Sequence, residues 1–206
     1  ARPASAAAIP PLSRKTALLR RQFITSHQLR FQEIRTTNDL FFVCAFMLMA
    51  NRISVLNETL ISHTINRSES LSATRAESHR CAVEALVALK AFICQQGMME
   101  HRLRDYKNYV VVFLEWHLNT ISGPAFHPFY QQVKEFVVAL DAKSDDFYDE
   151  FIAAAHHRIT TLSAEEYLFS LKDRVLKELE FFQARSSALQ QEVETLTHSL
   201  AGQKDE

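Results

Sequence analysis

Carboxylate and imidazole side chains, the groups that ligate metals or transfer protons, gather between residues 145 and 157. The cluster consists of Asp145, Asp146, Asp149, Glu150, His156 and His157. On one helix Asp146 and Glu150 lie a single turn apart, whereas His157 lies about 10 Å further along the axis. Ligands must converge to about 2 Å from one ion, so a single helix cannot bring all three there. We therefore interpret the cluster as a solvated helix face and predict no bound metal.

The apolar side of the helix that carries this cluster follows from the same spacing. We expect its core face to consist of Phe151, Ala155, Ile159 and Leu162, which leaves His157 toward water.

A second polar group, Glu115-Trp116-His117, lies in an apolar segment. A di-iron bundle needs Glu-x-x-His on two helices. Here, and at Glu77-Ser-His79, the acid and the imidazole are two residues apart and point to different sides of a helix. We interpret Glu115 and His117 as a satisfied polar pair in the core, with an interior catalytic or ligand-binding site as the alternative. No catalytic residue and no cofactor are predicted.

The three cysteines, Cys44, Cys81 and Cys94, form no CxxC motif. Cys81 and Cys94 are about 20 Å apart if they share one helix, so they cannot form a disulfide there. Because each lies among apolar neighbours, we expect reduced thiols in the core.

Glycine-dependent phosphate and acyl chemistry is excluded by the positions of the three glycines, Gly97, Gly123 and Gly202. A P-loop or a GxGxxG turn needs several glycines within a few residues, because the backbone must approach the anion closely. A GxSxG nucleophile elbow is absent for the same reason.

The elements that must position these side chains are predicted to be helices. The 206 residues include only 3 Gly and 5 Pro, against about 14 and 10 in an average chain. Sheet folds need many glycine and proline turns. We predict an all-α protein of about seven helices, an antiparallel bundle or helix-pair stack, with a long C-terminal helix of coiled-coil character.

Breakers and caps give the helix boundaries. Gly97 is expected to end a helix, Pro128 to begin one, and Ser163-x-x-Glu166 to form a capping box. The predicted helices are about 13–36, 39–68, 73–96, 98–120, 128–142, one from Ser144 and one from Ser163. The expected organisation is a basic Ala/Pro-rich segment (1–12), a helical bundle (13–162), the long helix (163–202) and a tail (203–206).

The long helix carries a heptad pattern. Its d positions are Leu168, Val175, Phe182, Leu189 and Leu196, and its a positions are Lys172, Leu179, Ser186, Val193 and Leu200. Eight of these ten positions are apolar, which is typical of a coiled coil. The first half has further apolar residues and favours packing along its own bundle. From Ser186 onward we predict a partner helix at Leu189, Val193, Leu196 and Leu200.

Charge is unevenly distributed along the chain. Segment 1–32 carries six basic and no acidic side chains, and the rest of the chain carries 17 basic and 24 acidic ones, a net charge of −7. This basic start is typical of an organelle-import segment or its remainder, which favours a mitochondrial location; the other reading is cytoplasmic. Arg14, Lys15, Arg20 and Arg21 are expected to contact an acidic partner subunit, or alternatively an anionic membrane surface. Basic residues are not interleaved with aromatics, so no nucleic-acid partner is expected.

No transmembrane segment is predicted. The most apolar run, residues 40–50, is 11 residues long, whereas a span needs about 20.

These observations predict a non-catalytic structural or scaffold subunit of a larger multi-protein assembly. A mitochondrial complex, such as a membrane-energy complex, is the favoured setting. Two alternatives are a peripheral membrane or lipid-binding helical protein, and a helical-bundle enzyme or ligand-binding protein with an interior polar site.

Overall fold

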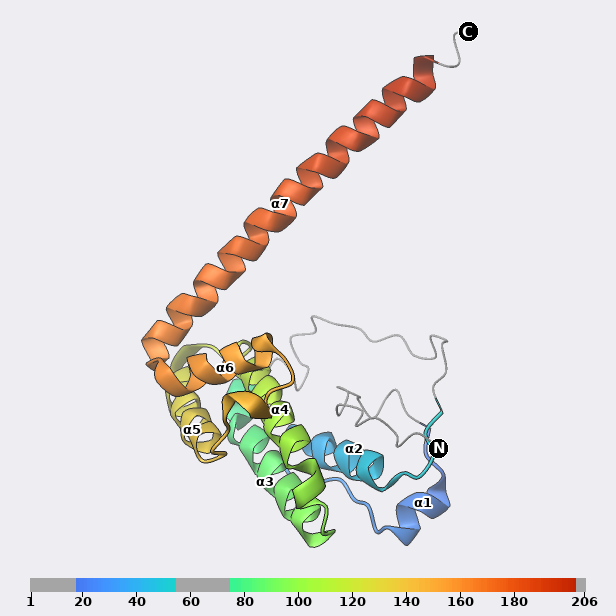
Figure 1. The fold of residues 1–206 in the computed structure, drawn as a ribbon, viewed down its shortest axis with the longest axis vertical. Coiled ribbons are helices and arrows are strands. Elements are labelled where there is room, and N and C mark those ends of the chain that lie inside the picture. Colours follow the sequence, from blue (N-terminus) through green and yellow to red (C-terminus); the bar gives the residue numbers. More distant parts are fainter. Residues whose placement is uncertain (1–17, 55–74, 203–206) are drawn as a thin grey trace. The chain divides into compact units, whose positions relative to one another are not determined.

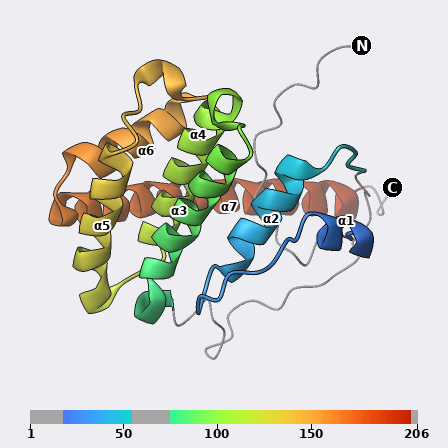
Figure 2. The same cartoon turned by 90° about the horizontal axis from the view of Figure 1, so that it is seen from below.

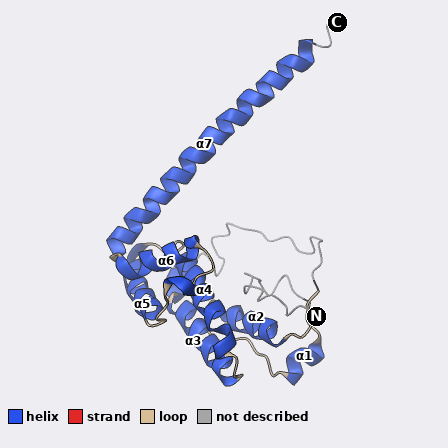
Figure 3. Ribbon diagram, in the orientation of Figure 1, coloured by secondary structure: helices blue, strands red, loops and turns tan. Residues whose placement is uncertain are grey.

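The computed structural model describes residues 18–54 and 75–202. Within these residues the regular secondary structure is helical throughout and there is no strand, which confirms the all-α prediction (Figure 3). The chain divides into two compact units, residues 1–161 and 162–206, and each is treated separately below.

The first unit contains six of the described α-helices (Figure 1). They are α1 (Arg21–Ser26), α2 (Asn38–Met49), α3 (Arg80–Gln95), α4 (Met99–Leu118), α5 (Phe126–Val138) and α6 (Glu150–Thr161). Short 3-10 turns precede α3, α5 and α6, at Arg75–Ser78, Gly123–Ala125 and Ser144–Asp146. The second unit is the helix α7 (Ala164–Gly202), which is 39 residues long.

Helix α4 lies at the centre of the first unit, because it packs against α3, α5 and α6 (Figures 1 and 2). Its apolar side chains recur at helical spacing and are almost inaccessible to solvent: Tyr106, Val110, Val111, Leu114 and Leu118. The buried residues of α3 include Leu86, Leu89 and Ile93, and those of α5 include Phe129, Val133 and Val137. Burial of these side chains is the main stabilising contribution to the bundle.

Two buried tyrosines join neighbouring helices through their hydroxyl groups. Tyr106 on α4 donates a hydrogen bond of 2.9 Å to the carbonyl oxygen of Leu86 on α3. Tyr130 on α5 donates one of 3.2 Å to the carbonyl oxygen of Ile159 on α6. A buried hydroxyl without a partner would destabilise the fold, so these bonds allow two large aromatic side chains to fill the core.

A smaller apolar cluster joins α1 and α2 to α3. Its buried members are Leu29, Phe42, Val43, Ala45 and Phe46. Phe41 of α2 meets Phe92 of α3 edge to face, with the ring centroids 5.5 Å apart. Helix α2 is apolar on nearly every side, and this explains why it packs both on α3 and on the segment that precedes it.

Two predicted helix ends are confirmed. Gly97 has φ +66°, and the amides of Gly97 and Met98 donate to the carbonyl oxygens of Cys94 and Ile93, both at 3.0 Å, which is a Schellman motif. At the start of α7, the amide of Glu166 donates to Ser163 Oγ at 3.2 Å. The amide of Ser163 donates to Glu166 Oε2 at 2.7 Å, which completes the capping box.

The first two predicted helices are wrong in extent. In place of a helix over 13–36, the described part contains only α1, because Gln28 takes a left-handed conformation with φ 52° and breaks the helix before the buried Leu29. The predicted helix 39–68 ends instead at Met49, where Ala50 becomes extended. Ile53, expected on its apolar face, is 56% exposed. Residues 13–17 and 55–74 lie outside the described part.

Three further expectations need correction. Helix α5 begins at Phe126 and not at Pro128, which lies in its first turn, where no intrahelical amide bond is lost. Ser144 begins a 3-10 turn and not the sixth helix, which starts at Glu150. Phe151 is 86% exposed, because α6 is buried through Ala155 and Ile159, beyond its first turn.

Candidate functional site

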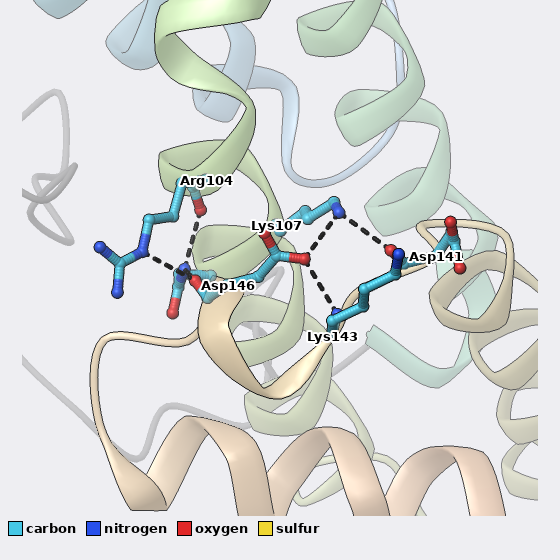
Figure 4. A network of polar contacts seen from close by, with 6 residues as sticks. Arg104, Lys107, Asp141, Lys143 and Asp146 are labelled. Atoms are coloured by element: carbon cyan, nitrogen blue, oxygen red, sulfur yellow. Dashed lines mark hydrogen bonds and ion pairs between the residues drawn. The ribbon is translucent and has the colours of Figure 1, made fainter.

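The acidic cluster between residues 145 and 157 separates into exposed carboxylates and one structural carboxylate. Asp145, Asp149 and Glu150 are exposed, and Asp149 caps α6 by accepting a hydrogen bond of 2.9 Å from the amide of Ile152. His157 is exposed as predicted. Asp146 differs from the prediction of a solvated face, since it is partly buried against α4 (Figure 4).

Asp146 forms an ion pair with Lys107, a buried lysine of α4. The Lys107 Nζ and Asp146 Oδ2 atoms are 2.8 Å apart, and the two side chains are 9% and 29% exposed. Lys107 Nζ also donates to the carbonyl oxygen of Asp141 at 3.0 Å, and the amide of Lys143 donates to Asp146 Oδ2 at 2.9 Å. The hydrogen bonds from Lys107 and Lys143 lower the pKa of the Asp146 carboxyl.

Other side chains of α4 bind the backbone of the loop that carries Asp146, between α5 and α6. Asn108 Nδ2 donates to the carbonyl oxygen of Asp146 at 2.7 Å, and Asn108 Oδ1 accepts from the amide of Tyr148 at 2.9 Å. Arg104 donates to the carbonyl oxygen of Asp146 at 3.1 Å (Figure 4). It also donates to the carbonyl oxygen of Phe147 at 2.8 Å. Each polar group therefore serves to hold the loop against α4.

A buried carboxylate extends this network. Asp105 is 5% exposed, lies 3.0 Å from Arg102 and accepts a hydrogen bond from the Tyr148 hydroxyl. Burial and the neighbouring Asp105 carboxylate raise the pKa of the Tyr148 phenol to about 12. At neutral pH this phenol stays protonated, which suits a hydrogen-bond donor.

This polar network is not among the features predicted from the sequence, although one signal points to it. Lys107 is four residues from Val111 and seven from Leu114, so it lies on the buried face of α4. A lysine on such a face needs a carboxylate or carbonyl partner. Its partners, Asp141 and Asp146, lie in a distant part of the chain, and sequence spacing does not indicate which residues they are.

Glu115 and His117 both make polar contacts inside the helical bundle. Glu115 Oε1 accepts a hydrogen bond of 2.5 Å from Arg158 of α6, in a pair that is about one-fifth exposed. His117 is 2% exposed, and its Nδ1 is 3.0 Å from the carbonyl oxygen of Phe113. Glu115 thus contacts α6, whereas the His117 ring lies near the Phe129 ring of α5, with centroids 6.5 Å apart, so the two side chains leave α4 toward different neighbours.

The cysteines differ in exposure, and the prediction of three core thiols is wrong for one of them. Cys44 is buried, Cys81 is half-buried and Cys94 is exposed near the end of α3. Burial raises the pKa of the Cys44 thiol to about 12, so this thiol stays protonated at neutral pH.

No group of three or more His, Cys, Asp or Glu side chains in 18–54 and 75–202 could hold a metal ion. None of the helices described in these ranges is both long and apolar enough to cross a bilayer.

We define the seam of α7 as its a and d positions. It is the largest set of exposed apolar side chains among the residues that the sequence pattern indicated. Seven apolar seam residues have described side chains, and each is between 38% and 62% exposed: Leu168, Val175, Leu179, Phe182, Leu189, Val193 and Leu196. From Val175 to Thr197 every side chain of α7 is exposed. The side chain of Leu200 lies outside the described part, although its backbone is helical.

Two shallow hollows lie along this seam. One is lined by Ser186, Leu189, Gln190, Val193 and Glu194, and the other by Glu165, Leu168, Phe169 and Lys172. The first hollow also includes Glu194 at i+8, and in each hollow four lining residues follow the spacing i, i+3, i+4 and i+7. This is the spacing of the four-residue holes that receive a side chain of a facing helix in a coiled coil.

The predicted basic contact residues are described only in part. Arg20 and Arg21 are exposed at the start of α1, and Arg14 and Lys15 lie outside the described residues.

Of the apolar residues predicted to contact a partner, Leu189, Val193 and Leu196 lie on one exposed stripe of α7.

Comparison with known proteins gives no relative from which a function could be transferred: the chain matches no protein family, no curated protein and no solved structure.

Proposed function

We propose that this protein is a structural subunit of a larger protein assembly and that it binds a partner helix through the seam of α7. The observation that supports this most is the row of exposed apolar side chains at Leu189, Val193 and Leu196. They continue a heptad pattern that begins at Leu168. A stripe of this kind is typical of a surface that becomes buried on association.

The length of α7 supports the same proposal. Most helices in proteins are stabilised by packing an apolar face and not by helix propensity alone. All side chains from Val175 to Thr197 are exposed, so this part of α7 would gain stability from a facing helix. From Ser186 onward its apolar stripe is narrow, as expected for a coiled-coil seam.

A protein partner fits α7 better than a lipid surface. Helices that lie on membranes carry Lys and Arg on their polar face. Residues 164–202 contain seven acidic and four basic side chains, so the polar face of α7 would be repelled by anionic lipid. We therefore place the apolar seam against protein.

The location that we propose is mitochondrial. It is supported by the basic, acid-free segment 1–32, whose composition is typical of import segments. A membrane-energy complex is the setting that we favour for the assembly.

The native mass of the protein tests this proposal. Mitochondrial and cytosolic extracts of cells that make the protein are separated under native conditions. We expect the wild-type chain in the mitochondrial extract, in a species well above 47 kDa, twice the 23.6 kDa of one chain. Leu189→Glu should shift most of it to smaller species, because a charge at a seam position is costly to bury.

A matched control is Gln191→Glu, which adds the same charge on the opposite face of α7 and should leave the native mass unchanged. Deletion of residues 186–206 should act like Leu189→Glu. If the wild-type chain runs at its own mass, or if both glutamate variants behave alike, a structural role through α7 is wrong.

A further inference from the structure

The charged residues that flank the seam of α7 limit which helices can pair with it. In a coiled coil the e and g positions flank the seam and determine partner and orientation. The e positions of α7 carry no charge: Phe169, Leu176, Gln183, Gln190 and Thr197. The charged g positions are Glu178, Arg185 and Glu192.

We propose that the partner of α7 is a second copy of this chain, paired antiparallel over residues 175–200; this rests on the proposed function of the seam. Antiparallel helices bring g positions opposite g positions and a positions opposite d positions. We consider the alignment in which Leu179 of one copy faces Leu196 of the other, so that the numbers of any two facing seam residues add up to 375. In this alignment Arg185 of each copy lies beside Glu192 of the other. The symmetry of the pair therefore produces two ion pairs from one residue combination.

The seam residues also match in this alignment. Leu179 faces Leu196, Phe182 faces Val193, and Val175 faces Leu200 of the second copy. Ser186, which lines one of the hollows, lies opposite Leu189, so a small side chain faces a larger one. All eight layers between 175 and 200 thus contain at least one apolar residue.

Other self-pairings of α7 fit less well. An antiparallel alignment shifted by one heptad would place Arg185 against Arg185 and Glu178 against Glu192, and like charges in contact disfavour association. A parallel pair in register would place Lys172 against Lys172 in the seam and would form no ion pair between g and e positions. The proposed alignment leaves Lys172 outside the overlap.

Arg185 and Glu192 are suited to a charge-exchange experiment. Both side chains are exposed, and none of the residues three or four positions from either one is charged. Neighbours at those spacings are the ones that interact along a helix, so a change of charge at 185 or 192 reports on the second copy.

Sedimentation equilibrium of the full chain tests the pairing. We expect a dimer of about 47 kDa, twice 23.6 kDa, at micromolar concentration and moderate salt. Arg185→Glu should weaken the dimer roughly tenfold, because two attractive pairs become repulsive, and Arg185→Glu with Glu192→Arg should restore it. Lys177→Glu makes the same charge change on the opposite face and should have little effect.

Disulfide cross-linking tests the orientation. Leu179→Cys and Leu196→Cys are introduced separately into a chain that also carries Cys81→Ser and Cys94→Ser. When the two variants are mixed and mildly oxidised, peptide mass spectrometry should find the link between positions 179 and 196. Ser187→Cys mixed with Thr195→Cys, both away from the seam, should link much less.

The outcomes separate this inference from the proposed function. A chain that is monomeric at 100 µM, links of 179 to 179 or of 196 to 196, or failure of the double charge variant to restore the dimer would each overturn the antiparallel self-pairing. A purified monomer that is found in a large native assembly would leave the proposed function standing. A chain that is a 47 kDa dimer both when purified and in cell extracts would support the self-pairing and contradict the proposed role in a larger assembly.

Discussion

Lys107 and Asp146 illustrate how a charged pair can serve the fold of a helical protein. Lys107 lies on the buried face of α4, and its ammonium group contacts the carboxylate of Asp146 and the carbonyl oxygen of Asp141. A buried charge is tolerated only when it is paired and hydrogen-bonded. The pair therefore fixes the loop before α6, and its disruption should be visible in stability and its pH dependence.

Asp146→Asn should destabilise the protein by about 1–3 kcal/mol at pH 7, since a charged hydrogen bond to a nearly buried lysine is lost. The pKa of Asp146 is lower in the folded protein than its ordinary value of 3.8. Its contribution is thus complete above about pH 4 and is lost as the pH falls through the folded-state pKa. Urea unfolding between pH 3 and 7 measures both effects.

The wild-type protein should therefore lose stability on acidification more steeply than Asp146→Asn. The control is Asp145→Asn, whose exposed carboxylate should change the unfolding free energy by less than about 0.5 kcal/mol. Equal acid sensitivity in wild type and Asp146→Asn would show that the ion pair does not contribute as described.

Helix ends determine how the elements of the bundle follow one another. The α3–α4 connection is short because Gly97 reverses the chain in a left-handed conformation with φ +66°. The space around a Cβ atom at Gly97 is open, so the cost of a side chain there comes from the backbone conformation.

Gly97→Ala should destabilise the protein by about 1–2 kcal/mol, the cost of a left-handed conformation for a residue with a Cβ atom. Gly97→Asn should cost less, because asparagine is tolerated in this conformation. Thermal or urea unfolding of the two variants measures the difference. Two equally stable variants, or an alanine variant as stable as wild type, would contradict the assigned role.

At the scale of the whole molecule, charge is unevenly distributed along the chain. Segment 1–32 carries six basic and no acidic side chains, whereas the rest of the chain has a net charge of −7.

We expect the full chain not to float with vesicles that contain anionic phosphatidylserine at 0.15 M salt, because the acidic part is repelled by the same surface that attracts the basic part. Neutral phosphatidylcholine vesicles are the control, and recovery in the floating fraction should be the same for both. A several-fold excess on anionic vesicles, abolished by high salt, would instead favour the peripheral membrane alternative.

The sequence alone determined those properties that depend on neighbouring residues. The all-α class follows from the lack of glycine and proline, and the helix ends at Gly97 and Ser163 follow from local capping groups. The heptad spacing of α7 is likewise local, because it relates residues three and four positions apart. These features need no information about distant parts of the chain.

Tertiary structure decided the properties that depend on contacts between distant residues. No glycine or proline marks the end of α2 at Met49 or the break at Gln28, and no pattern indicates that Phe151 is exposed. Lys107 and Asp146 are brought together by the packing of a loop on α4 across a separation of 39 residues. Burial depends on which elements cover a side chain, so local spacing predicted the α7 stripe, whereas the folded chain determined that this stripe is exposed.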